Sequence, residues 1–188
     1  MVGAKILQND IWRREPQMLT RDYCITMARY NAWQNRNLRK LLQDMPPEEL
    51  TKDRGAFFGS ILATVNHILW ADTTWMARFQ DKPLPGGTAQ TSRDFQPTIA
   101  AWSGERFRMD GHIILWAEKV KSLDMISDLT WYSGTLNTTV SKNLGECVMH
   151  FFNHQTHHRG QVHAMLTQMG LKPEETDLFL MPQSGPWL

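Results

Sequence analysis

The sequence predicts an all-α protein, a four-helix bundle with a short β-hairpin inserted before its last helix. Three observations lead to this fold class. Four long segments have helical character, and proline, glycine or a polar loop marks their ends. One intervening segment is rich in Thr, Trp, Tyr and Val, the residues that favour strands. The chain shows no internal repeat and no low-complexity stretch that would indicate another architecture.

The first two helices are delimited by proline-containing segments. The first is expected over residues 22–44, because the pair Pro46 and Pro47 stops a helix. The second is expected over residues 57–80. It ends before the loop 81–87, which contains two prolines and two glycines.

The third and fourth helices differ in regularity. The third, residues 95–123, is the weaker prediction because Gly104 and Gly111 lie inside it. The fourth, residues 144–169, is continuous, and Gly170 follows it in the position of a left-handed C-cap.

Residues 129–141 (LTWYSGTLNTTVS) predict the hairpin, with Ser133 and Gly134 near its turn. The apolar tail, residues 177–188, is expected to pack back on the bundle or to join a dimer contact. We therefore divide the chain into an N-terminal extension, residues 1–20, and a single bundle domain, residues 21–188.

Composition narrows the functional classes. Lys and Arg number 20 against 19 Asp and Glu, and the absence of a basic stripe argues against nucleic-acid binding. The apolar runs are far shorter than the roughly 20 residues that span a bilayer, and the N-terminus does not resemble a signal peptide. Cys24 and Cys147 are too few for a disulfide scaffold and are expected to stay reduced, so a cytoplasmic location is expected.

The fourth helix carries an unusual concentration of imidazole. Four of the seven histidines fall within nine residues, and with His154 at 0° on a helical wheel the other three lie within about 60°. Cys147 and Gln161 share this side, whereas His163 lies on the opposite one. The clustered residues are His150, His154, His157 and His158.

This histidine face has two interpretations. Histidines at i and i+4 can direct two nitrogens to one metal ion at roughly 2.0–2.1 Å. Alternatively, the rings form a solvated face or are satisfied core residues. Phe151 and Met165 on the same face take the place of the charges that a solvated surface usually carries. The spacing alone leaves both interpretations open.

A third ligand has to come from another helix. His112 lies in the least regular helix, and His67 in the second helix is the better candidate. Small residues surround His67 on its wheel, which leaves room for a metal and a substrate; the alternative is that His67 simply faces solvent. These neighbours are Ser60, Ala63, Thr64, Ala71 and Thr74, with Trp70 beside them.

Four segments together resemble the DinB/YfiT-like family of small bacterial bundle proteins. They are VNHILWADTTWMARF (65–79), HFFNHQTHHRGQVHAMLTQMG (150–170), RYNAWQNRNLRKLL (29–42) and TDLFLM (176–181). The resemblance spans about residues 22–181, and its NHQTHHRGQ stretch is specific. It implies a four-helix bundle with a hairpin before the last helix, often as a homodimer.

The resemblance also implies a ligand set. Family members typically bind one divalent metal, zinc or nickel, through one histidine of the second helix and two in the HxxxH that precedes RGQ. At the matching positions stand His67, His154 and His158. His157 is not a ligand in this pattern. His157, Gln161 and His150 remain candidates for supporting the ligands from around the site.

The resemblance leaves the reaction of such a site open. Members of the family include transferases that use low-molecular-weight thiols, thiol-dependent isomerases and metal-dependent hydrolases. An ion held by three neutral imidazoles keeps an open position, which can activate a thiol or a water. We expect a transferase with a small-molecule substrate and a thiol cosubstrate; the alternatives are a hydrolase and a non-catalytic bundle that binds a metal or another ligand. A structural zinc would need a fourth ligand, and Cys147 and His150 are expected to lie too far along the helix.

Hydrolysis usually requires a general base, and the HxxxH interior holds no carboxylate. His157, Asp72, Glu146 and Tyr30 are all candidates, and no catalytic residue is assigned.

Other residues have more local expectations. Arg159 is expected to make a salt bridge or a helix contact, and Gly160 to allow another element to approach closely. Trp33, Trp70 and Trp75 are expected to fill the core or to line an apolar substrate pocket.

Overall fold

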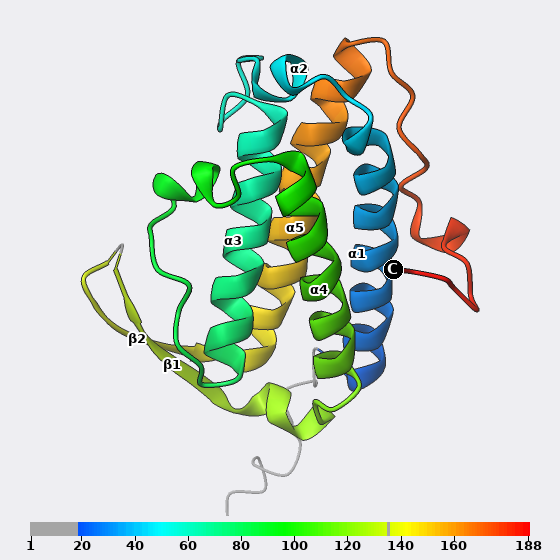
Figure 1. Cartoon of the computed structure of the whole chain (residues 1–188). Coiled ribbons are helices and arrows are strands. Elements are labelled where there is room, and N and C mark those ends of the chain that lie inside the picture. The colour runs from blue at the N-terminus through cyan, green and yellow to red at the C-terminus, as the bar shows by residue number, and fades with distance from the viewer. Residues whose placement is uncertain (1–18, 135) are drawn as a thin grey trace, which may run out of the picture.

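The fold is described from a computed structural model of the chain, in which residues 19–134 and 136–188 are described. Four long helices form a bundle, and a two-stranded antiparallel hairpin precedes the last of them, so the predicted fold class is confirmed (Figure 1). The predicted extension, residues 1–20, lies almost entirely outside the described residues, and the division into extension and domain stays a prediction. None of the described helices is long and apolar enough to cross a membrane.

The four bundle helices all begin at a capping side chain. Thr20, Ser60, Thr98 and Asn143 each accept a hydrogen bond from a backbone N–H in the first turn, which satisfies a donor that the helix leaves free. The helices are α1 (Arg21–Gln43), α3 (Ile61–Phe79), α4 (Ile99–Ala117) and α5 (Leu144–Gln168).

Two predicted helices were too long. The second begins at Ile61 rather than at residue 57, because Gly59 adopts a positive φ of 82° and ends a tight loop before the Ser60 cap. The third begins after Thr98 and ends at Ala117, with the 3-10 helix η2 (Ser122–Ile126) following it. A short helix, α2 (Pro47–Thr51), was not expected; Pro47 occupies its first turn, where a missing N–H costs nothing. Gly170 has a φ of 80°, which confirms the expected cap.

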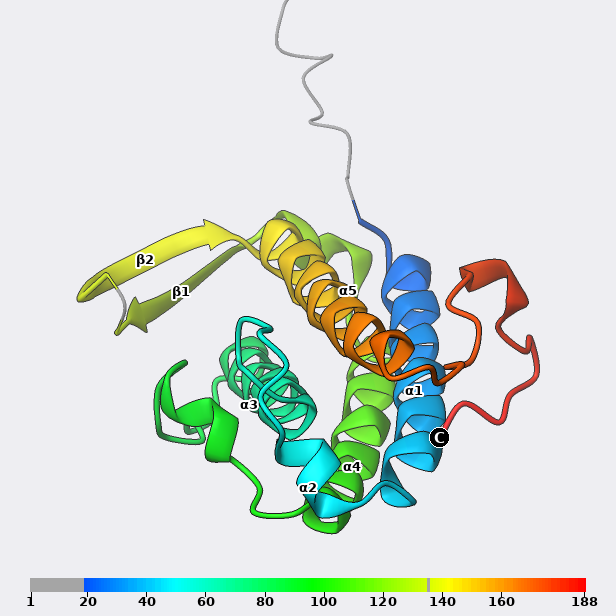
Figure 2. The same cartoon turned by 90° about the horizontal axis from the view of Figure 1, so that it is seen from above.

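The hairpin joins β1 (Asp128–Ser133) to β2 (Thr138–Asn143), and its strands pair from Asp128 opposite Asn143 to Ser133 opposite Thr138. It projects from the side of the bundle (Figure 1). Seen from above, α1 lies beside α4 and α5, and α3 lies beside α5 and α4 (Figure 2). Another 3-10 helix, η1 (Thr91–Asp94), packs against α3.

The bundle core consists of two apolar clusters with polar residues between them. One cluster includes Ala28, Phe151 and Trp116, and the other includes Leu42, Val65 and Val162. The polar residues lie at intermediate positions along each of the four helices and are fully or almost fully buried. We call them the polar layer: Asn31, Asn35, Asp72, Arg106, Asp110, Gln155 and Arg159.

Arg106 holds the polar layer together. Its NH1 lies 2.5 Å from Asp72 Oδ2 and its NH2 lies 2.8 Å from Asp110 Oδ1, so one guanidinium joins carboxylates of α3 and α4. Asn31 and Asn35 of α1 donate to Asp110 at 3.1 and 2.9 Å. Since buried charges are tolerated only when they are paired and hydrogen-bonded, these contacts fix how the helices face one another.

The C-terminal segment packs on the outside of α1 (Figure 2). This confirms one of the two expectations for the tail. Tyr30 Oη donates to the carbonyl of Thr176 at 2.5 Å, and Gln34 Nε2 donates to that of Glu175 at 3.0 Å. Farther along, the Arg29 guanidinium lies 4.4 Å from the ring centre of Trp187.

Candidate metal centre

His67 of α3 converges with His154 and His158 of α5. One nitrogen of each ring lies within 4.8 Å of the other two, and no further described Cys, His, Asp or Glu joins this group. His67 Nε2 and His154 Nε2 are 3.2 Å apart. Two nitrogens that share a tetrahedral zinc at about 2.0–2.1 Å lie about 3.3 Å from each other, so this separation is that of two ligands of one ion.

The orientation of His67 is fixed by η1. Its Nδ1 lies 2.9 Å from Ser92 Oγ, and this hydroxyl lies 2.7 Å from the carbonyl of Ala89. The single hydroxyl proton goes to the carbonyl, so Ser92 accepts a hydrogen bond from Nδ1–H of His67. The network therefore assigns the lone pair of His67 to Nε2, the atom that faces His154.

His158 is oriented in the same manner from within α5. Its Nδ1 lies 2.8 Å from Gln161 Oε1, an oxygen that can only accept, so Nδ1 carries the proton and Nε2 the lone pair. The amide nitrogen of Gln161 in turn donates to His157 Nε2 at 3.3 Å. Such contacts to the remote ring nitrogen are typical of metal-binding histidines.

Burial keeps these imidazoles neutral. His67 and His158 are only 6% and 7% exposed. Desolvation, with His158 nearby, lowers the pKa of His67 to about 4, and desolvation with the neighbouring histidines lowers the pKa of His154 to about 3. Desolvation also lowers the pKa of His158. At neutral pH the three rings are therefore unprotonated, as metal coordination requires.

An aromatic-walled hollow of about 480 Å³ opens beside the cluster. The ring of Phe58 stacks on His67 with centroids 4.1 Å apart, while Phe57 is 82% exposed at the edge. The remaining lining residues are His67, His157, His158, Gln161, Ala89, Gln90 and Arg93. Two of the three histidines, His67 and His158, thus border a space that combines apolar and hydrogen-bonding surface.

His150 and His112 do not belong to the group of three, whereas the ring of His157 lies 4.7 Å from that of His158. His150 is exposed, with its ring 5.6 Å from that of His154 and 5.3 Å from that of Trp75. His112 pairs with Gln80 Oε1 at 2.8 Å. Cys147 does not join this group; it is buried, and burial raises the pKa of its thiol, which disfavours the reactive thiolate.

Three of the four candidate general bases are poorly placed. Asp72 is buried and already accepts from Arg106 and Gln155. Tyr30 donates to Thr176 on the other side of α5. Glu146 is eight residues from His154, about 12 Å along the helix. His157 alone of these four lines the hollow.

Of the three local expectations, the one for Gly160 needs correction. A Cβ on Gly160 would meet nothing within 4 Å, so no element packs closely there and the predicted close approach is wrong. Trp33 lies in the core and Trp75 packs against it, which is one of the two expectations for the tryptophans. Trp70 is half-buried and donates to the carbonyl of Gly86, and Phe57 and Phe58 form the aromatic wall of the hollow. Arg159 does contact another helix, since it donates to Asn31 of α1.

Sequence reasoning also missed Ser92, Phe57 and Phe58. Ser92 lies on a four-residue 3-10 helix, for which periodicity provides no signal, and the two phenylalanines belong to a loop that was expected to be helical.

Comparison with known proteins identifies the family to which this chain belongs. The sequence profile of the DinB family matches residues 18–187. The chain belongs to the DinB family. The Protein DinB of Bacillus subtilis (strain 168) is 29% identical over 161 residues, covering 83% of this chain and 91% of that protein.

Among solved structures, a DinB-like protein from Bacillus cereus ATCC 10987 has a similar fold. The TM-score is 0.52 at 16% sequence identity, and the match covers 76% of this chain and 90% of that one. At this identity the likeness concerns the fold alone.

Proposed function

We propose that this DinB-family protein binds one divalent metal ion through Nε2 of His67, His154 and His158. The observation that carries the proposal is the convergence of three neutral rings, two of which have their Nδ1–H engaged by Ser92 and Gln161. Zinc and nickel are the ions that we propose, since both accept imidazole ligands.

The same site supports a transferase that activates a low-molecular-weight thiol. When bound, a divalent ion would supply Lewis acidity that lowers the pKa of a thiol. The hollow beside the histidines would receive the cosubstrates: Phe57 and Phe58 would contact their apolar parts, and Arg93 and Gln90 their polar parts. His157, on the wall of the hollow, is placed to exchange a proton with solvent or substrate through its imidazole.

Thiol transfer is preferred over hydrolysis because of the donor set. Among the described residues, no carboxylate joins the histidine group, and Asp72 is engaged in the polar layer. Hydrolysis at such a site would have to rely on His157 as the general base, whereas a thiol on a divalent ion would lose its proton to water without a dedicated base. A homodimer remains our prediction for the assembly.

The test of the activity uses a chromogenic electrophile, 1-chloro-2,4-dinitrobenzene, with a panel of small thiols. In this reaction a sulfur–carbon bond forms, the carbon–chlorine bond breaks, chloride leaves and the thiol proton passes to water. We expect zinc- or nickel-loaded protein to accelerate the reaction with at least one thiol, and His158→Ala to lose that acceleration. Full metal content without any thiol-dependent turnover across the panel would count against the transferase.

A further inference from the structure

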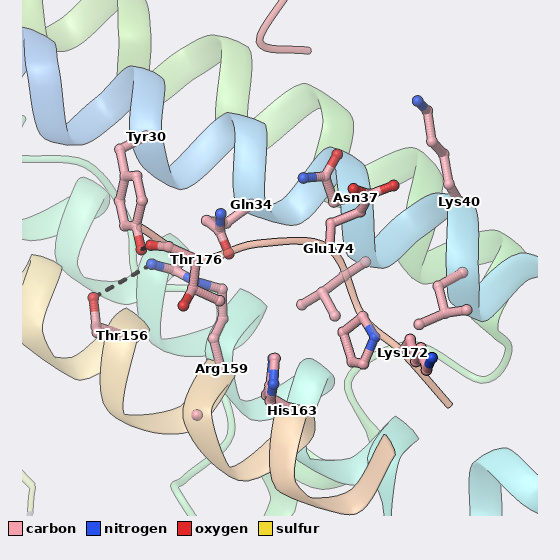
Figure 3. A pocket seen from close by; sticks show the side chains of 14 residues that line it. Tyr30, Gln34, Asn37, Lys40, Thr156, Arg159, His163, Lys172, Glu174 and Thr176 are labelled. Atoms are coloured by element: carbon pink, nitrogen blue, oxygen red, sulfur yellow. Dashed lines mark hydrogen bonds between the residues drawn. The ribbon is translucent and has the colours of Figure 1, made fainter. Parts of the chain in front are cut away.

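A second, larger cavity lies on the opposite face of α5 from the metal ligands. Its volume is about 630 Å³, within the range of small-molecule sites, and it is enclosed by α1, α5 and the segment 172–176 (Figure 3). None of its lining residues lines the hollow beside the histidines. The cavity is therefore separate from the proposed metal centre.

Arg159 brings a buried positive charge to the wall of this cavity. Its side chain is 8% exposed, and its hydrogen-bond partners are neutral: Asn31 Oδ1, and Thr156 Oγ1 at 3.4 Å. The ring of Tyr30 lies 5.7 Å from its guanidinium carbon. None of the ion pairs among the described residues includes Arg159.

The carboxylates of the polar layer do not neutralise Arg159 by direct contact. Asp72 and Asp110 each pair with Arg106, and Arg159 is linked to Asp110 only through Asn31. A guanidinium that is buried without a contacting carboxylate favours an anionic ligand, because its N–H donors match carboxylate and phosphate oxygens.

The rest of the lining supports the same ligand class. Lys40 and Lys172 are exposed and add two further positive charges, whereas Glu174 is the single acidic residue among those that line the cavity. Figure 3 shows the two lysines toward one end and the Arg159 guanidinium toward the other, beside Tyr30 and Thr156. Leu38 and Leu41 of α1 provide apolar surface.

We propose that this cavity binds a small organic anion, whose carboxylate or phosphate group pairs with Arg159 while its apolar part contacts Leu38 and Leu41. The site does not depend on the proposed metal or on the proposed transferase. Both head groups share the chemistry that a guanidinium recognises, and the choice between them is part of the test.

Gly160 offers a way to block the cavity without disturbing the bundle. It lines the cavity on α5, and a Cβ there would meet nothing within 4 Å. A leucine at this position therefore has room to extend into the cavity, and leucine favours a helix more than glycine does. The matched control is Gly104→Leu on α4, where a Cβ would approach only the end of the exposed Arg108 side chain, at 3.7 Å.

The full-length protein is titrated with benzoate, phenyl phosphate and the neutral analogue benzamide. Calorimetry and nuclear magnetic resonance measure the binding of each compound. We expect at least one anion to bind ten-fold or more tightly than benzamide. Gly160→Leu should weaken that binding at least ten-fold with an unchanged or higher Tm, and Gly104→Leu should not. The tighter of the two anions identifies the preferred head group.

A second variant tests the contribution of the two lysines that line the cavity. Lys40→Gln combined with Lys172→Gln changes two exposed side chains, so the fold should be retained, and anion affinity should fall several-fold. Equal affinity for benzamide, no binding of either anion, or native anion affinity in Gly160→Leu would each overturn the proposal.

Discussion

Gln155 Nε2 donates a 2.9 Å hydrogen bond to Asp72 Oδ1, which joins α5 to α3 inside the polar layer. Gln155 directly follows His154, and Asp72 lies five residues after His67. The contact therefore links the two helices that supply the three histidines, close to where their rings meet. We expect this one amide to couple the register of the two helices to the geometry of the ligands.

Gln155→Leu should weaken both the fold and the metal site. Asp72 would lose a buried donor, which costs about 1–3 kcal/mol of the free energy of unfolding. Metal affinity should fall as well, because His154 would lose the contact that sets the rotation of its helix. Urea denaturation and a metal titration check the two effects. Gln168→Leu, at the exposed end of the same helix, is the control and should change neither.

Ser92→Ala isolates the orientation of His67. Removing the hydroxyl takes away the acceptor for Nδ1–H, and the loss of such a partner typically reduces metal affinity 10–100-fold. Competition with a chromogenic chelator measures the affinity. Ser103→Ala removes a hydroxyl that contacts Arg39 instead, so it should retain native affinity. Equal affinities for both variants would show that Ser92 does not position the ligand.

Arg106→Met should be among the most destabilising single changes on α4. It leaves Asp72 and Asp110 buried without their counter-charge, a loss of roughly 3–5 kcal/mol in the free energy of unfolding. Arg108→Met removes the exposed partner of Glu105 on the same helix and should leave the urea midpoint unchanged. If the two variants unfold at the same urea concentration, the polar layer does not stabilise the bundle as described.

The stability of the metal-free protein should depend on pH through the histidines. Their pKa values in the fold, about 4 for His67 and about 3 for His154, lie below the value of about 6.5 for an unfolded chain. Between those limits the unfolded state binds more protons, so the free energy of unfolding should fall as pH is lowered from about 7 to 4. Urea denaturation after chelation checks this. His154→Gln should show a shallower fall, and an identical pH profile would contradict the burial of that ring.

Much of the fold could be predicted from the sequence because its signals are local. Pro46 and Pro47, Gly170 and the Thr-rich segment before α5 marked boundaries that the structure retains within a few residues. The start of α3 was misjudged because Phe57 and Phe58 continue an apolar pattern, whereas the backbone turns at Gly59. The hydrophobic pattern carries no information about Ser60, the residue that caps the start of α3.

The candidate site was predictable only in part. His154 and His158 share a helix face by spacing, but the pairing with His67 spans 87 residues. The helical wheel offered His67 only as a candidate, and the family resemblance joined it to the pair. The polar layer escaped notice because Arg106 and Asp110, read along one helix, look like an exposed ion pair. Their burial depends on how four helices meet, which no single segment reveals.

The most direct test of the account is the metal content of the purified, metal-reconstituted protein. Native protein and the control His157→Ala should hold about one equivalent of zinc or nickel, whereas His67→Ala, His154→Ala and His158→Ala should each lose it. Circular dichroism would confirm that all five proteins are folded. Metal retained without His67, or lost without His157, would contradict the three-histidine site.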